Sequence, residues 1–145
     1  MQANTVEIGN NINGPSLIKA PNWLPNCLGR YYLYFGHHFG QNIRTAFSNN
    51  LTAPWSVYKG GVLDLKETPF AQKRPNVVQP QWAVEQGADG LYPHIASPDV
   101  HIDKEKKSLE MFFHGLDRDG EQRSLCALSN DGLTWRVQSK RINQT

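Results

Sequence analysis

One internal repeat constrains this chain more than any other feature of its sequence. Four landmarks of the first half recur in the same order in the second half, at an offset of 78 to 83 residues. The paired landmarks are Leu33–His37 with Met111–Gly115, Ala46–Asn49 with Ala127–Asn130, Trp55 with Trp135, and Pro15 with Pro98. A repeat at a nearly constant offset indicates two copies of one supersecondary unit.

Each copy of this unit has the pattern of four short strands. Tyr31–Phe35 and Leu109–Phe113 are aromatic runs bounded by glycine or charged residues, and Ile43–Phe47 and Ser124–Leu128 are further strands. The nine prolines and twelve glycines fall mostly between such runs, where they mark turns. A four-stranded antiparallel meander is the blade of a β-propeller. We therefore expect an all-β fold with two blades.

A segment rich in proline, glutamine and glycine separates the two units. The 145 residues form a single domain (1–145) in three consecutive parts: a first blade at 13–58, an inserted strand and long loop at 59–93, and a second blade at 94–138. Within the insert we expect a short strand at Val62–Leu65 and at most a short helix at Gln81–Gly87. A loop of this length in a compact domain is either functional or disordered.

Composition excludes several classes of function. The formal net charge is +2, and the charged residues are dispersed, which favours neither nucleic acid nor an acidic membrane surface as partner. No apolar run is long enough to cross a membrane, and no signal peptide is visible, so the default location is the cytoplasm. Cys27 and Cys126 are expected to be reduced thiols. The five histidines lack ligand spacing, so we expect no metal, and no cofactor is indicated.

Two proline-containing motifs carry a resemblance to a known family. Ser97-Pro-Asp-Val-His-Ile-Asp103, followed by the strand Leu109–Phe113, resembles the Ala-Pro-Asp-Val-His motif of five-bladed propeller glycosidases. Gly14-Pro-Ser-Leu-Ile18, followed by Arg30–Phe35, is similar to the Asp-Pro-Ser and Tyr-Tyr-Leu-Tyr pair that opens their first blade. These enzymes are the arabinanases and β-xylosidases, with invertases and levansucrases as more distant relatives. The resemblance implies an incomplete five-bladed propeller of the glycosidase type.

The resemblance also implies where catalytic groups would lie. Such enzymes place a carboxylate base or nucleophile before the proline of Asp-Pro-Ser. An aspartate after the proline of Ala-Pro-Asp tunes the pKa of the acid, which is a glutamate on a later blade. Asp99 matches the tuning aspartate, whereas the base position falls on Gly14, with Asn13 beside it. Neither residue accepts a proton at neutral pH, and we expect the blade of the glutamate to be missing. The implied function is carbohydrate binding without hydrolysis.

The strand that begins at Ser97 supplies the expected binding face. By alternation, Asp99, His101 and Asp103 share one face, while Val100 and Ile102 take the opposite face against a neighbouring blade. We expect a sugar beside Asp99 and His101. A purely structural role is the alternative for Asp99, because a carboxylate that follows a proline can accept hydrogen bonds from backbone N–H groups.

Aromatic residues divide between the core and the binding surface. Trp55 and Trp135 recur at the same blade position, which favours the core for both. Trp82 and Tyr92 lie in the unrepeated insert, where an exposed surface is more typical, and they are expected to cover the sugar together with Asn13.

Two alternative functions remain open at this point. One is a true glycoside hydrolase whose site is completed by other chains, and the other is a protein–protein assembly module without a sugar site. Two blades share one interface, so both outer faces should present apolar residues such as those alternating in Tyr31–Phe35 and Leu109–Phe113. Repeat proteins with so few units need caps or partners. We therefore expect a homo-oligomer formed through blade faces.

Overall fold

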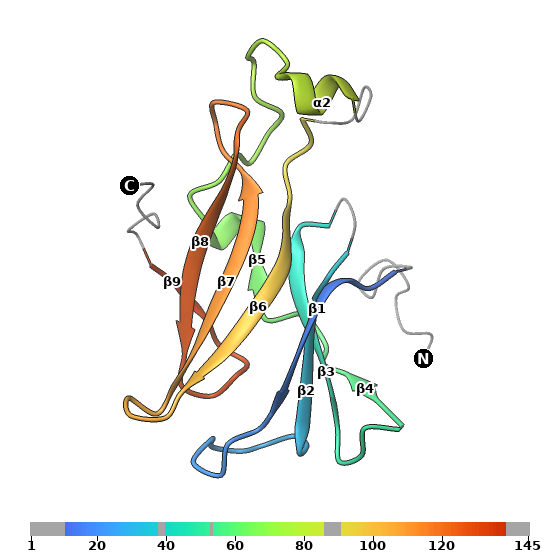
Figure 1. The fold of residues 1–145 in the computed structure, drawn as a ribbon, viewed down its shortest axis with the longest axis vertical. Coiled ribbons are helices and arrows are strands. Elements are labelled where there is room, and N and C mark those ends of the chain that lie inside the picture. The colour runs from blue at the N-terminus through green and yellow to red at the C-terminus, as the bar shows by residue number, and fades with distance from the viewer. Residues whose placement is uncertain (1–10, 38–39, 53, 86–90, 139–145) are drawn as a thin grey trace.

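The computed structural model describes residues 11–37, 40–52, 54–85 and 91–138. Two antiparallel sheets, each a four-stranded meander, make up most of the fold (Figure 1). The first sheet contains β1 (Asn13–Lys19), β2 (Tyr31–Gly36), β3 (Asn42–Ser48) and β4 (Ser56–Val57). The second contains β6 (Ile95–Asp103), β7 (Ser108–Leu116), β8 (Gln122–Ser129) and β9 (Arg136–Val137). We call them sheet A and sheet C. The expected all-β fold with two blades is confirmed.

The core lies between the two sheets. Sheet A contributes Tyr32 and Tyr34, which alternate along β2, and sheet C contributes Leu109, Met111 and Phe113, which alternate along β7. All five are at most 2% exposed. Burying large aliphatic and aromatic side chains stabilises a fold by about 1.5–3 kcal/mol each, so this interface is the main source of stability.

The Tyr34 and Trp135 side chains join the sheets where the outer strand of sheet C begins. Their rings meet edge to face with centroids 5.6 Å apart. The Tyr34 hydroxyl and the Trp135 indole N–H both donate to the carbonyl of Gly132, at 2.9 and 3.2 Å. Each polar group is thereby satisfied inside the core.

Trp55, which the repeat predicts to be a core residue, is only half-buried and lies outside the core cluster. The turn before Trp135 turns back at Gly132, whose φ is +77°. The turn before Trp55 is one residue longer and has no such glycine. Trp55 is followed by the two exposed residues of β4, so the prediction of a core position is wrong for this repeat.

The two outer faces are not equally apolar, which corrects the expectation drawn from Leu109–Phe113. Leu109, Met111 and Phe113 all point toward sheet A, and the alternating residues Glu110 and Phe112 face outward. In sheet A, Tyr31 and Leu33 do face outward, as expected, and are half-buried. The physical reason is register: the strand of sheet C places its larger apolar set on the inner face.

The insert, which connects the two sheets in sequence, contains three short elements. Strand β5 (Leu63–Asp64) pairs with β3, and the 3₁₀ helix η1 (Leu65–Glu67) follows it directly. Helix α2 (Gln81–Glu85) lies beyond the end of sheet C at which β6 begins (Figure 1). Within the described residues no helix is long and apolar enough to cross a membrane. Cys27 and Cys126 are free thiols.

Candidate functional site

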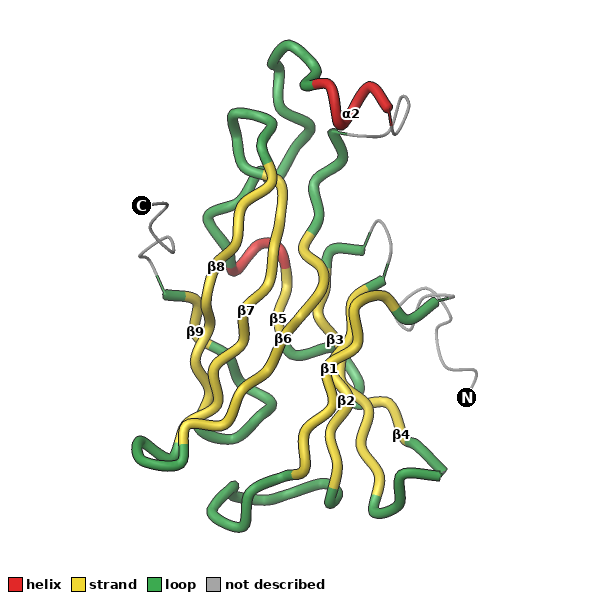
Figure 2. The backbone as a smooth tube through the Cα atoms, in the orientation of Figure 1, coloured by secondary structure: helices red, strands yellow, loops and turns green. Residues whose placement is uncertain are grey.

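We call β1 and β6, the first strands of the two sheets, the inner strands; they lie side by side where the sheets meet (Figure 2). Each carries a β-bulge at the same place in the repeat. Gly14 has φ +54° and Ser97 has φ +51°, and each precedes a proline. A positive φ is uncommon outside glycine, and a following proline disfavours it further. Such strain tends to persist at functional sites, where surrounding contacts hold it in place.

The two bulges are in direct contact. A Cβ added to Gly14 would lie 2.6 Å from the Ser97 Cα and 2.8 Å from its Cβ. Two residues further along β1, the Ser16 hydroxyl accepts the backbone N–H of Val100 at 2.9 Å. A side chain thus links the strands across this junction. We call the region around Gly14, Ser97 and Asp99 the inner-strand junction.

Asp99 and His101 form the polar feature of the junction. The His101 Nε2 lies 2.8 Å from the Asp99 Oδ2, and their side chains are 56% and 67% exposed. The pair is therefore open to solvent on the outer face of sheet C, and both side chains can hydrogen-bond to a ligand. Val100 between them is buried in the core, as alternation predicts.

Phe112 belongs to the same surface, and the sequence interpretation did not include it. It pairs with Asp99 across β6 and β7, and its ring meets the His101 ring edge to face at 5.7 Å. The signal that could have found it is the strand register, because cross-strand partners share a face. A carboxylate, an imidazole and a half-buried aromatic ring therefore lie together here.

The other residues expected at the site are distributed differently. Asn13 lies at the junction: it pairs with Gly36 and directly precedes Gly14. Trp82 packs instead on a small cluster of Ala83, Leu91 and Leu116 beyond the start of sheet C.

Tyr92 lies three residues before β6, with its ring 4.5 Å from the ring of His94. Asp99 is the fifth residue of that strand, so it lies roughly 13 Å along β6 from Ile95. The contribution of Trp82 and Tyr92 to a sugar site stays a prediction.

A histidine pair lies near the start of β6. His94 is buried, its Nδ1–H donates to the Tyr92 carbonyl at 2.9 Å, and the centroids of the His94 and His114 rings lie 5.6 Å apart. Burial, together with the charge of His94, lowers the pKa of His114 below its usual value. Among the described residues, no group of three or more histidine, cysteine or acidic side chains is gathered as a metal site would require.

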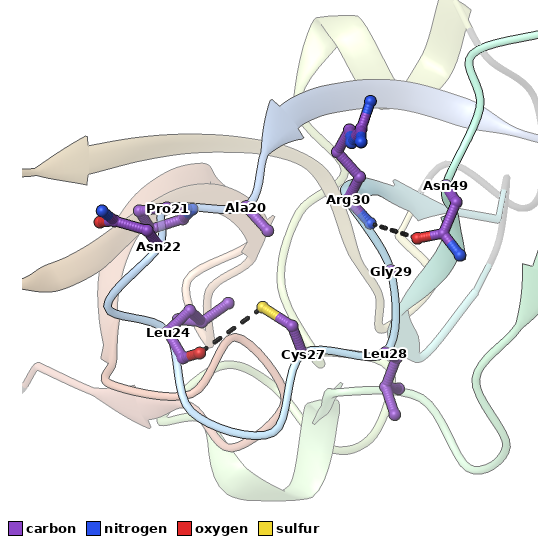
Figure 3. Close-up of a pocket in the computed structure, with 9 residues that line it drawn as sticks. All are labelled: Ala20, Pro21, Asn22, Leu24, Cys27, Leu28, Gly29, Arg30 and Asn49. Atoms are coloured by element: carbon purple, nitrogen blue, oxygen red, sulfur yellow. Dashed lines mark hydrogen bonds between the residues drawn. The ribbon is translucent and has the colours of Figure 1, made fainter.

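An open pocket of about 430 Å³ lies at the other end of β1, in the connection to β2 (Figure 3). Leu24, Cys27 and Asn49 are among its lining residues, and the Cys27 thiol donates to the Leu24 carbonyl at 3.6 Å. The Arg30 guanidinium points away from Cys27 in this view. The pocket has no contact with the inner-strand junction, because β1 separates the two.

Solved structures identify the class of fold. The chain superimposes on a GH43 β-xylosidase/α-arabinofuranosidase from a compost metagenome with a TM-score of 0.62 and 16% identity, covering 91% of this chain and 36% of that one. A thermostable family-43 glycoside hydrolase gives a TM-score of 0.63 at 18% identity, and the match covers 92% of this chain and 34% of that one. A GH43_1 enzyme of Xanthomonas citri, crystallised with xylotriose, gives a TM-score of 0.61 at 14% identity, and the match covers 90% of this chain and 32% of that one. The two sheets are thus two blades of a glycosidase-type β-propeller, and the propeller is incomplete.

Sequence comparison adds one relative. The chain is 33% identical over 111 residues to an uncharacterised protein, R118, of Acanthamoeba polyphaga mimivirus, covering 72% of this chain and 28% of that protein. No protein-family model matches the chain. The chain spans about a quarter to a third of the length of these relatives.

Proposed function

We propose that the chain binds carbohydrate at the inner-strand junction and does not hydrolyse glycosidic bonds. The observation that carries the second half of this proposal is Gly14. It stands where the resemblance to propeller glycosidases puts a carboxylate base, and its added Cβ would meet Ser97 at 2.6 Å. Backbone conformation and packing both favour a residue without a side chain there.

The binding half of the proposal rests on Asp99, His101 and Phe112. An ionised carboxylate accepts hydrogen bonds from hydroxyl groups, and a neutral imidazole both donates and accepts. The edge-to-face arrangement of His101 on Phe112 adds an apolar surface against which the C–H face of a sugar ring can pack. The surface is open on one side, so we expect weak binding.

Activity is tested with aryl arabinosides, xylosides and fructosides. We expect no release of the aryl group above background, because general acid and base assistance are each worth about 10² to 10⁴ in rate. Turnover that disappears in Asp99→Ala would contradict the proposal and identify a hydrolase.

Binding is tested by titrating a panel of pentose and fructose oligosaccharides. Asp99→Asn should weaken binding, since it replaces a charged acceptor with a neutral amide. Asp103→Asn is the matched control: it lies on the same face but at the hairpin turn, where Lys106 holds its carboxylate at 2.9 Å. Equal loss in both variants would place the site elsewhere, and no binding to the wild type would favour an assembly module.

One observation favours hydrolysis as the second candidate function. Asp99 and Glu110 are diagonal neighbours across β6 and β7, because Glu110 pairs with His101. The backbones of diagonal residues on one face lie about 7–8 Å apart, which lets their two side chains reach the carboxyl spacing of an inverting glycosidase. Turnover lost in both Asp99→Asn and Glu110→Gln would establish this candidate.

A further inference from the structure

Strand β3 carries a buried cation without a counter-charge. Ile43 and Phe47 pack in the core between the sheets, so by alternation Arg44 lies on the opposite, outer face of sheet A. Arg44 is nevertheless only 4% exposed, and its Nη1 atom has no hydrogen-bond partner among the described residues. Arginine keeps its charge in a protein and is almost never fully buried unless it is paired. This position therefore calls for an anion.

No described carboxylate is placed to supply that anion. Residues 11–63 contain four lysines and arginines and no aspartate or glutamate, and Asp64 is the first acidic residue after them. Both Asp64 oxygens are engaged: Oδ1 accepts the Lys66 N–H at 2.9 Å, and Oδ2 accepts the side-chain amide of Asn42 at 2.9 Å. Burial lowers the pKa of the Arg44 guanidinium below its usual value, and no carboxylate of the described residues offsets this.

The turn 58–62 borders Arg44 and leaves room beside it. The N–H groups of the first and last residues of this turn donate to the two carbonyls on either side of Arg44, at 2.9 and 2.8 Å. The middle of the turn is open, because a Cβ added to Gly60 would meet no atom within 4 Å. Lys59, in the same turn, is exposed and adds a second positive charge. A local excess of positive charge favours the approach of an anion.

We propose that Arg44 binds an oxyanion, a carboxylate or phosphate group, which enters over the turn 58–62 and is also contacted by Lys59. A guanidinium presents a planar fork of N–H donors that matches two oxygens of such a group, so the hydrogen bonds are charge-assisted and bidentate. The site lies on the outer face of sheet A, apart from the inner-strand junction. An anion and a sugar therefore bind independently.

Thermal unfolding in Tris chloride with added inorganic phosphate or acetate tests this site. At millimolar anion the wild type should gain about 3 °C or more in Tm, because a ligand that binds only the folded state stabilises it. Arg44→Met should gain only the small general effect of these salts. Arg30→Met is the matched control: Arg30 is exposed, and its loss should leave the gain unchanged. A gain with both anions indicates a carboxylate site and a gain with phosphate alone a phosphate site. Equal gains in wild type and Arg44→Met would overturn the proposal.

Stability without added anion gives a second, independent test. Arg44→Met should then be as stable as the wild type or more stable, because an apolar side chain of similar length replaces a buried charge that has no partner. Arg44→Lys keeps the charge but loses the fork, so its gain with phosphate should be smaller than that of the wild type. A wild type with a much higher Tm than Arg44→Met in Tris chloride alone would show that the guanidinium is already paired, contrary to the proposal.

Glu7 is the one acidic residue before Asp64 in the sequence, and it lies outside the described residues. Glu7→Gln should leave both the Tm and the gain with phosphate unchanged. A loss of stability in Glu7→Gln that disappears in the Arg44→Met background would show that the chain's own carboxylate fills the site, and the proposal would fail.

A phosphate titration of the ¹⁵N-labelled wild type locates the site even if the Arg44 variants do not fold. We expect amide shifts at residues 43–45 and 58–62, and shifts confined to other residues would contradict the assignment. Sugar binding is followed at different amides, those of the inner-strand junction, so failure of one proposal does not imply failure of the other.

Discussion

Gly14 shows how a single position can decide what the junction does. Gly14→Ala should destabilise the fold by roughly 2 kcal/mol or more, because the left-handed conformation is strained for alanine and the new Cβ collides with Ser97. Gly60→Ala is the matched control: Gly60 has φ +86°, but no atom lies within 4 Å of an added Cβ. That control should cost only about 1 kcal/mol. Urea unfolding measures both, and equal losses would show that contact with Ser97 contributes nothing.

The sequence predicts the Asp99 and His101 pair but not the strain beside it. Period-two alternation is enough to place both side chains on one face and Val100 in the core. Ser97 has a positive φ and contacts Gly14, which is distant in sequence, whereas the proline at the next position disfavours that φ locally. Phe112 reaches this surface through cross-strand pairing with Asp99, which alternation within a single strand does not specify.

At the scale of elements, the hairpin turn between the two outer strands of each blade begins with a side chain that accepts backbone N–H groups. Asp131 accepts the backbone N–H groups of Leu133 and Thr134 at 2.8 and 2.7 Å. Its counterpart Asn50 accepts the N–H of Thr52 at 3.1 Å. Burial alone would raise the pKa of Asp131, but these N–H donors outweigh it and lower the pKa below its usual value.

The stability contributed by Asp131 should therefore depend on pH. A carboxyl group with a lowered folded pKa stabilises the fold above its unfolded pKa of about 3.9, and this contribution is lost as the pH falls through the folded value. Asp131→Asn should lower the free energy of unfolding by roughly 1 kcal/mol at pH 7, and this loss should approach zero near pH 2. Asn50→Ala has no titrating group and should cost the same at both pH values. If Asp131→Asn destabilises the fold by the same amount at pH 7 and near pH 2, this account is contradicted.

The strands themselves could be predicted closely, because aromatic and β-branched runs between turn residues mark them directly. The sequence also predicts a short strand and a short helix in the insert, and both are present as β5 and α2. It does not predict which tryptophan is buried. Burial of Trp135 depends on the turn at Gly132 and on contact with Tyr34, which lies 98 residues before Gly132 in the sequence.

At the scale of the whole molecule, the repeat determines which sheet faces pack against each other, but it does not determine which residues lie on the outer faces. The outer face of sheet A corresponds in the repeat to the inner face of sheet C, so the two outer faces are opposite faces of the same unit. On the outer face of sheet C, Glu110 and His101 occupy the positions at which sheet A buries Tyr32 and Ile18 in the core. The fold is thus shared with the propeller glycosidases, and a shared fold does not by itself determine the chemistry of the junction.

One measurement tests sugar binding without hydrolysis most directly. The ¹⁵N-labelled chain is titrated with xylotriose and arabino-oligosaccharides, and amide shifts and the anomeric signals of the sugar are followed in the same sample over a day. The account predicts shifts concentrated in Asn13–Ser16 and Ser97–Asp103, together with unchanged anomeric signals. Anomeric signals that convert to those of shorter sugars, or amide shifts confined to the pocket at Cys27, would contradict it.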